Sequence, residues 1–215
     1  MAIVFTGDEF ADGGDFIAKT LKEQKAKASF FFTGRFLHNP SFEKTITILK
    51  KDGHYIGAHS YEHLLYCDWI KRDSLLVTRQ QFDDDLSKNY NELQSFGLQK
   101  QKVSFFLPPF EWYNDSIAAW TRKMGLQLIN YTPGTLSHAD YTTPANKNYR
   151  SSDLIYTSII NYEKTHPFGF NGFILLMHIG TDAKRNDKLY HRLPELLRWL
   201  RSKGYKLVTV NELLQ

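Results

Sequence analysis

The feature that most constrains the fold is an alternation of short apolar segments with amphipathic ones. Runs of apolar, β-branched and aromatic residues predict buried strands at 2–5, 28–32, 53–58, 103–106, 125–130, 172–177 and 205–208. Segments with apolar residues at helical spacing predict helices at 15–23, 41–51, 73–96, 114–123, 151–164, 189–203 and 210–214. Strands that alternate with helices form parallel sheets covered by those helices. We therefore expect an α/β fold, a distorted (β/α)7-type barrel of parallel strands with outer helices, as a single domain over 1–215.

The composition excludes several classes of protein. Hydrophobic residues make up 42% of the chain and charged residues 23%, which excludes a disordered chain. The best apolar run, 173–177, is far shorter than a membrane span needs, so we expect no transmembrane segment. The 27 basic and 23 acidic residues are scattered and no nucleic-acid motif is present, so we expect no nucleic-acid partner.

Cysteine usage and the start of the chain bear on its compartment. The single cysteine, Cys67, excludes an internal disulfide and is expected to fill a small buried space. Met1 leads almost directly into the first predicted strand, without the charged and apolar regions of a signal peptide. The expectation is either a cytoplasmic protein or a catalytic domain cut from a longer exported chain, which would be periplasmic or secreted.

Polar residues with catalytic or ligand chemistry follow three of the predicted strands. The pair Asp8 and Glu9 follows the first strand, His59 and His63 the third, and His178 the strand at 172–177. In parallel α/β folds the carboxyl ends of the strands meet at one edge, where active sites are found. We therefore expect these side chains to share one site.

The histidine pair is the sharpest local signal. Four-residue spacing would place His59 and His63 on one face of a helical turn, close enough to share a cation. Imidazole suits zinc, with cobalt and nickel as alternatives. A carboxylate of Asp8 or Glu9 can complete the site while the other acts as base. His178 is either a core histidine or an acid that protonates a leaving group.

Several segments, in this order, resemble motifs of the polysaccharide deacetylase family, the NodB-homology domain of carbohydrate esterase family 4. Residues 3–9 look like its first motif, a strand ending in Thr-Phe-Asp-Asp, and 27–34 resemble its Lys-Ala-Thr-Phe-Phe strand. Residues 53–63 are similar to its second motif, His-Ser/Thr-x-x-His. Residues 106–110, 175–178 and 204–210 resemble its Arg-x-Pro-Tyr motif, its Leu-x-His motif and its closing strand.

This resemblance implies a function. The chain would remove acetyl groups from an N- or O-acetylated polysaccharide or oligosaccharide by attack of a metal-bound water. Asp8 would be the base and His178 the acid. Glu9, His59 and His63 would hold one divalent metal ion, zinc first, with cobalt or nickel possible. The region 108–112 would contact substrate through Pro109, Phe110 and Trp112, although Trp112 suits the core as well.

The chain also departs from the family pattern. Glu9 stands where the family has aspartate, so Asp8 as the ligand, or Asp12 joining the site, stays open. Leu107 replaces the arginine that orients the base in the family. The fourth motif, which buffers the acid histidine, is not recognisable in 131–149, and Asp182 is one candidate partner for His178.

These departures leave two alternatives. One is a catalytically impaired carbohydrate-binding relative, and the other is a metal-dependent hydrolase of non-sugar amides. The sequence leaves open which glycan and linkage are used, what replaces the missing arginine, and the oligomeric state.

Overall fold

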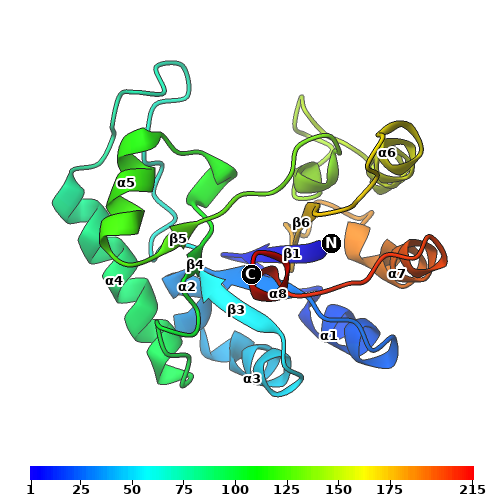
Figure 1. The fold of residues 1–215 in the computed structure, drawn as a ribbon, viewed down its shortest axis with the longest axis horizontal. Coiled ribbons are helices and arrows are strands. Elements are labelled where there is room, and N and C mark those ends of the chain that lie inside the picture. Colours follow the sequence, from blue (N-terminus) through cyan, green and yellow to red (C-terminus); the bar gives the residue numbers. More distant parts are fainter.

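The structure is a computed structural model that describes residues 1–215. Its centre is one six-stranded parallel sheet in the order β5-β4-β3-β2-β1-β6, which curls into an open barrel (Figure 1). The strands are β1 (Ala2–Gly7), β2 (Ser29–Phe32), β3 (Tyr55–Ala58), β4 (Phe105–Phe106), β5 (Gln127–Leu128) and β6 (Ile174–His178). The predicted barrel of parallel strands with outer helices is confirmed.

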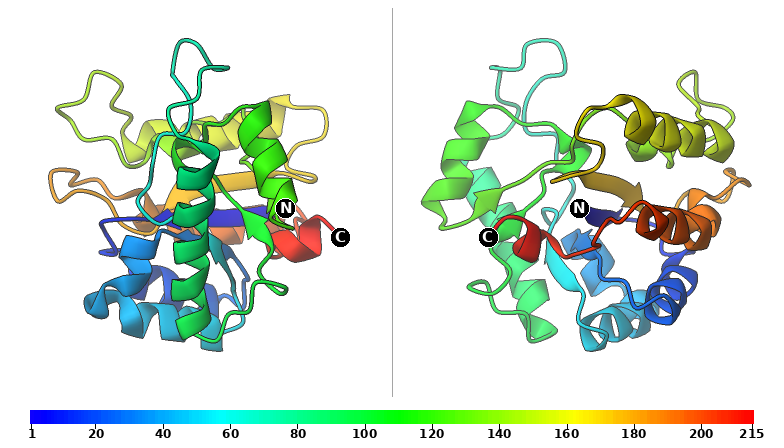
Figure 2. Two further views of the ribbon diagram at one scale, coloured as in Figure 1. Left: turned by 90° about the vertical axis from the view of Figure 1, so that its left-hand side faces the viewer. Right: turned by 45° about the vertical axis from the view of Figure 1, so that its right-hand side comes forward.

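Helices surround this sheet, as the two further views show (Figure 2). They are α1 (Gly14–Glu23), α2 (Gly34–His38), α3 (Glu43–Lys51), α4 (Arg79–Ser95), α5 (Asp115–Lys123), α6 (Ser152–Thr165), α7 (Leu193–Ser202) and α8 (Val210–Leu213). Capping side chains set several helix starts. Thr78 forms a capping box with Gln81 at the start of α4, and Asn114 accepts a hydrogen bond from Ile117 N at the start of α5.

The core explains why the central strands read as continuous apolar runs. Every residue of β1, β2 and β3 is buried, because helices or other strands cover both faces of the sheet. The outer helices bury one face each, as α7 does with Leu193, Leu196, Leu197 and Leu200. Each such leucine contributes about 1.5–3 kcal/mol through burial.

No seventh strand lies between β5 and β6, and an irregular segment connects these two edges of the open barrel. Thr132 N donates to Ile174 O at 3.0 Å, and Ile174 N donates to Thr132 Oγ1 at 3.0 Å, which joins the chain after β5 to the start of β6. The predicted strand at 205–208 is wrong. That segment meets the amino end of β1, where Met1 N donates to Lys206 O and Val208 N donates to Met1 O.

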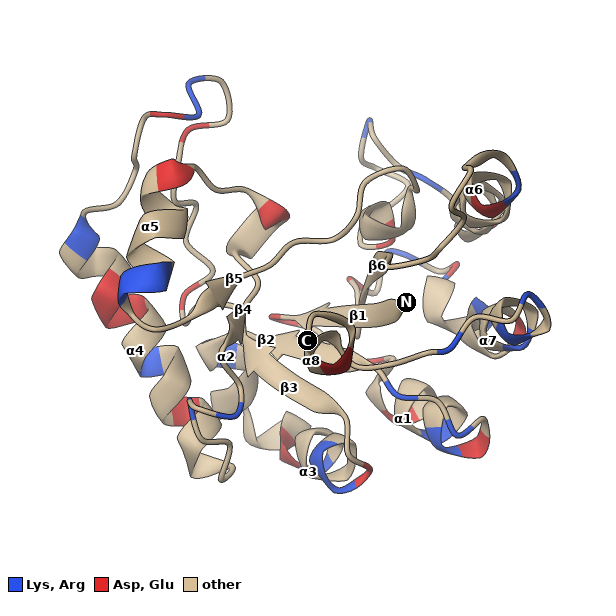
Figure 3. Cartoon of the chain, viewed as in Figure 1, with Lys and Arg blue, Asp and Glu red and all other residues tan.

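The long helix predicted at 73–96 begins later, at Arg79, because Thr78 caps it there. The residues before it form a loop, pinned by an isolated bridge between Cys67 and Leu75. Charged side chains of both signs are mixed over the helices and loops, while the strands carry few (Figure 3). None of the helices is both long and apolar enough to span a membrane.

Candidate active site

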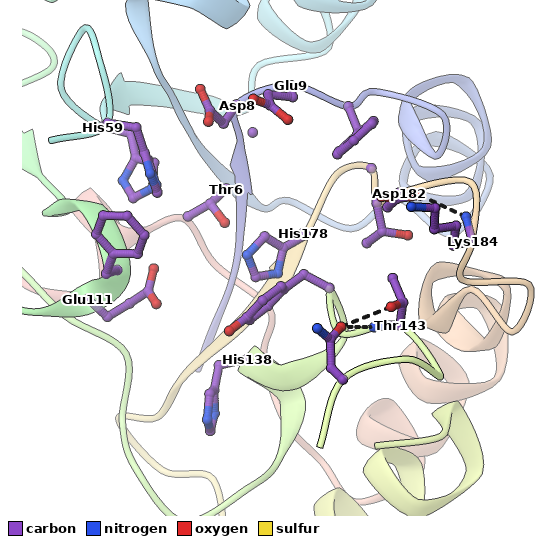
Figure 4. Close-up of a pocket in the computed structure, with 18 of the residues that line it drawn as sticks. Thr6, Asp8, Glu9, His59, Glu111, His138, Thr143, His178, Asp182 and Lys184 are labelled. Carbon is purple, nitrogen blue, oxygen red and sulfur yellow. Dashed lines mark hydrogen bonds between the residues drawn. The ribbon is translucent and has the colours of Figure 1, made fainter. Parts of the chain in front are cut away.

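A cavity of about 870 Å³ lies at the carboxyl ends of the strands (Figure 4). The residues predicted to carry chemistry all line it: Asp8, Glu9, His59, His63 and His178. The parallel register explains this convergence, because β1, β2, β3 and β6 all end at this edge of the sheet.

The carboxylate of Asp8 is held by two donors from the next strand connection. Thr33 Oγ1 donates to Asp8 Oδ1 at 2.9 Å, and Arg35 Nη2 donates to Asp8 Oδ2 at 2.6 Å. Gly7 pairs with Phe32 in the sheet, which brings Thr33 beside Asp8. Neither Thr33 nor Arg35 was identified from sequence. Thr33 carried a signal, since it caps α2 by accepting from Phe36 N.

Glu9 and Asp12, the two other acidic residues that follow β1, have different surroundings from Asp8. The side chain of Glu9 is exposed and has no hydrogen-bond or salt-bridge partner within the chain. Asp12 accepts from Thr181 N at 2.7 Å and from Tyr190 OH at 2.8 Å, and it pairs with Lys188 Nζ at 3.0 Å. Asp12 therefore ties the loop after β6 to the body of the protein and does not line the cavity.

His59 follows β3 directly and is buried. Its Nδ1 lies 2.7 Å from Leu107 O, and since a carbonyl oxygen only accepts, Nδ1 must carry the proton. Nε2 is therefore the nitrogen with a free lone pair. Burial lowers the pKa of His59 well below its ordinary value, and the neighbouring His63 ring lowers it further.

The backbone between the two histidines is a tight loop and not the predicted helical turn. Ser60 and His63 both have positive φ, at 68° and 56°. Ser60 Oγ accepts from His63 N at 3.0 Å, and the buried Asp85 of α4 accepts from the N–H groups of Tyr61 and Glu62, each at 2.9 Å. These bonds hold a conformation that L-residues otherwise avoid.

The loop nevertheless brings the two imidazoles together. Their ring centroids are 5.0 Å apart, and Phe110 packs edge-on against His63 at 4.4 Å. Burial lowers the pKa of His63 to about 4, against an opposing contribution from the charge of Asp8. Both rings are thus neutral near pH 7, as metal ligation requires.

His178 ends β6 and has a different partner. Its Nδ1 lies 2.6 Å from Asp140 Oδ1, and its backbone N donates to Asp140 Oδ2 at 3.0 Å. Burial alone would lower the pKa of His178, but the charge and hydrogen bond of Asp140, helped by Glu111, outweigh it and raise the pKa. Asp140 therefore takes the place considered for Asp182. Asp140 lies in the segment 131–149, where the sequence shows no recognisable fourth motif. The burial of Asp140 could not be predicted from the sequence pattern.

The turn after β4 also contributes residues to the lining of the cavity. Phe110 and Glu111 line it, whereas Pro109 is buried beneath and does not line it. Trp112 does not line the cavity; Arg72 lies over its ring at 4.2 Å, and its ring is tilted against Trp69 at 5.6 Å. Of the two tryptophans, the exposed Trp69 is the one that lines the cavity.

The imidazole pair fits a divalent metal ion. A ligating histidine usually donates its second ring N–H to a carbonyl or carboxylate, as His59 does to Leu107 O. No carboxylate completes a three-ligand site with the two imidazoles, because no three His, Cys, Asp or Glu side chains stand close enough to hold an ion. Asp8 lies between His59 and Glu9 in Figure 4.

Known proteins share this sequence pattern. The profile of the polysaccharide deacetylase family matches residues 8–129. A peptidoglycan-N-acetylglucosamine deacetylase from Bacillus cereus is 27% identical over 197 residues, which covers 91% of this chain and 78% of that enzyme. The protein YlxY from Bacillus subtilis is 27% identical over 207 residues, which covers 94% of this chain. The chain spans only 54% of the length of YlxY.

Solved structures share the fold. A family 4 acetyl xylan esterase from Clostridium thermocellum, in complex with a cobalt ion, has a TM-score of 0.75 at 20% identity, covering 99% of this chain and 88% of that one. A family 4 pseudoenzyme from Bacillus anthracis has a TM-score of 0.72 at 20% identity, covering 100% of this chain and 64% of that one.

These matches define the class of the protein as a carbohydrate esterase family 4 barrel. Because the family profile covers more than half of its length, the chain belongs to the polysaccharide deacetylase family. The resemblance drawn from its motifs is confirmed.

Proposed function

We propose that the chain is a metal-dependent hydrolase that removes acetyl groups from N- or O-acetylated carbohydrate. The observation that carries this proposal is the combination of groups around one cavity: a fixed carboxylate at Asp8, two neutral imidazoles, and a third histidine whose pKa is raised. A binding protein has no need of a base and an acid on opposite sides of its ligand. Amide or ester hydrolysis needs both.

His59, His63 and Glu9 would hold the metal ion, with zinc as the first candidate and cobalt or nickel as alternatives. The choice of Glu9, and not Asp8, as the carboxylate ligand is supported by the hydrogen bonds on both oxygens of Asp8. These bonds fix the Asp8 carboxylate, while the exposed Glu9 is free to turn. When bound, the ion polarises the acetyl carbonyl and lowers the pKa of a water molecule.

Asp8 would accept the proton of the attacking water. Each carboxylate oxygen has two lone pairs, so Asp8 can keep its bonds to Thr33 and Arg35 and still accept a third. Arg35 would replace the arginine that is missing at Leu107. It reaches Asp8 from the start of α2, where the sequence motifs gave no reason to expect it.

His178 would protonate the departing amine or hydroxyl from Nε2, since Nδ1 is bound to Asp140. Its raised pKa supports this role, because an acid must hold its proton at the working pH. Hydrogen-bond donors near the proposed metal site would stabilise the oxyanion of the tetrahedral intermediate.

The substrate would be an acetylated polysaccharide or oligosaccharide. Relatives that act on peptidoglycan and xylan support this class. The exposed aromatic side chains at the cavity, Trp69, Phe110 and Tyr141, offer faces on which sugar rings stack. Pro109 and Trp112 would support these faces from behind.

The test is acetate release from N-acetylated chito-oligosaccharide and from acetyl-xylan, by protein loaded with zinc or cobalt. Asp8→Asn should retain the metal and lose activity, whereas Glu9→Ala should lose the metal. Reversal of these two results would make Asp8 the ligand and contradict the assignment.

A second candidate is a carbohydrate-binding relative without activity. The absence of the motif arginine at Leu107 and the likeness to a family 4 pseudoenzyme favour it. Stoichiometric metal and glycan binding without acetate release from either substrate would support this reading and overturn the first.

A further inference from the structure

The turn after β4 contains two consecutive residues in a conformation that favours glycine. Phe110 has φ 58° and Glu111 has φ 54°. Among the five non-glycine residues with positive φ, three line the cavity, namely His63, Phe110 and Glu111. Backbone strain of this kind persists only where the surroundings enforce it, and it gathers at functional sites.

Hydrogen bonds on both sides enforce the strained turn. Glu111 N donates to Pro108 O at 3.0 Å, and Trp112 N donates to Pro109 O at 3.2 Å. Asn130, just after β5, donates from Nδ2 to Glu111 O at 2.8 Å. None of these bonds uses the side chain of Glu111, so glycine at this position would keep them and remove the strain. The turn itself therefore gives no reason for a glutamate.

The side chain of Glu111 points into the cavity, on the side of Thr6 and His138 (Figure 4). No group of the chain donates a hydrogen bond to its carboxyl, and no cation pairs with it. Burial raises the pKa of Glu111 to about 7, while the nearby His178 opposes this increase. An acidic group that is partly buried and unpartnered is costly, so it calls for a ligand.

Two more polar atoms nearby lack partners. Thr6 Oγ1 and His138 Nδ1 are buried without a hydrogen bond, and both residues line the same cavity. Buried polar groups in native proteins are normally satisfied, and exceptions cluster where a ligand or water completes them. This side of the cavity therefore suits a ligand rich in hydroxyl groups.

We propose that Glu111 is a substrate-binding residue whose carboxyl accepts a hydrogen bond from a hydroxyl of the acetylated sugar. The inference rests on the proposed function. Glu111 and His178 line the same cavity, so a sugar whose acetylated nitrogen or oxygen faces His178 brings its other polar groups within the cavity that Glu111 also lines.

The test compares Glu111→Gly with Lys25→Gly. Lys25 is exposed, lies far from the cavity at the end of α1, and has φ 48°, so its replacement by glycine relieves the same kind of strain. Both variants should melt about 2–4 °C higher than the unchanged protein, if each gains roughly 1 kcal/mol. Only Glu111→Gly should lose kcat/KM for chito-oligosaccharide, by about 10- to 100-fold.

Glu111→Gln gives a conservative check, because its amide oxygen still accepts a hydrogen bond. It should retain more of the kcat/KM than Glu111→Gly. The inference is overturned if Glu111→Gly keeps the full kcat/KM, or if it melts lower than the unchanged protein, since Glu111 would then serve the fold.

A binding titration separates this inference from the proposed function. If the unchanged protein releases no acetate, binding of chito-oligosaccharide is followed by tryptophan fluorescence in the unchanged protein and in Glu111→Gly. Weaker binding by Glu111→Gly upholds the role of Glu111 although the hydrolase proposal fails. Equal binding by the two proteins, or no binding by either, overturns the role of Glu111 as well.

Discussion

His59 and His178 follow or end two strands of the same sheet, face the same cavity, and each use Nδ1 in a short hydrogen bond. The Nδ1 partners lie at almost equal distances, 2.7 Å for Leu107 O and 2.6 Å for Asp140 Oδ1. The pKa values of the two rings nevertheless move in opposite directions, lowered for His59 and raised for His178.

The charge of the partner explains this difference. Burial lowers the pKa of both rings, and a neutral carbonyl cannot offset that cost for His59. A carboxylate can, and Asp140 does so for His178. One residue type in one cavity thus yields a neutral ring suited to a metal ion and a ring with a raised pKa, which suits acid catalysis. The comparison teaches that the partner, more than the degree of burial, assigns the role.

The largest expected effect comes from removing the neutral ring. His59→Ala should weaken metal binding by more than about 100-fold, because loss of even an outer-shell partner costs 10- to 100-fold. Metal content after dialysis measures this, and acetate release should disappear with the metal. The exposed His38 of α2 gives the control, since His38→Ala should keep both. Stoichiometric zinc on His59→Ala would show that the neutral ring is not a ligand.

Removal of the His178 ring, whose pKa is raised, should separate chemistry from metal binding. His178→Ala should lower kcat by about 10²- to 10⁴-fold, the usual contribution of a general acid, while metal content stays unchanged. Steady-state kinetics together with metal analysis checks both halves of this prediction. Loss of metal from His178→Ala would indicate that His178, like His59, is a metal ligand, and the proposed difference between the two rings would be wrong.

The charge of Asp140 can be removed while one oxygen stays to accept from His178 Nδ1, although the acceptor of the bond from His178 N is lost. Asp140→Asn takes away the negative charge that raises the pKa of His178. Because the acid must be protonated, activity is lost as pH rises through that pKa, so the alkaline limb of the kcat profile should move to lower pH. The loss of kcat should be smaller than in His178→Ala. An unmoved alkaline limb would mean that Asp140 only positions the ring.

The smallest effect concerns the second carboxyl beside His178. The folded-state pKa of Glu111 is about 7, above its ordinary value of 4.5. The stability that its protonated form contributes is therefore complete below pH 4.5 and is lost as pH rises through about 7. Glu111→Gln, which cannot ionise, should reduce the fall in Tm over this range by on the order of 2–4 °C, the shift from about 1 kcal/mol. If the Tm values of the two proteins fell by the same amount over this pH range, the environment described for Glu111 would be contradicted.

Much of the fold could be predicted from periodicity. The apolar runs of β1, β2, β3 and β6 lie within two residues of their predicted bounds, because strands buried on both faces must be apolar throughout. The segment 205–208 misled the prediction, since apolar and aromatic residues are frequent there while the chain only crosses the amino end of β1. The start of α4 depended on a cap, Thr78, that lies inside the predicted helix.

The sequence by itself determined where Asp8, His59 and His178 meet, because residues at the carboxyl ends of parallel strands converge whatever the loops do. Only the tertiary structure decided which neighbours surround each of them. Arg35 and Asp140 reach the side chains of Asp8 and His178 from segments outside the predicted strands, and Glu111 reaches the cavity through a left-handed backbone conformation. Such placements leave no periodic signal in the sequence. Charge and burial at a site depend on such neighbours, so the pKa that separates a ligand from an acid is a property of the folded chain.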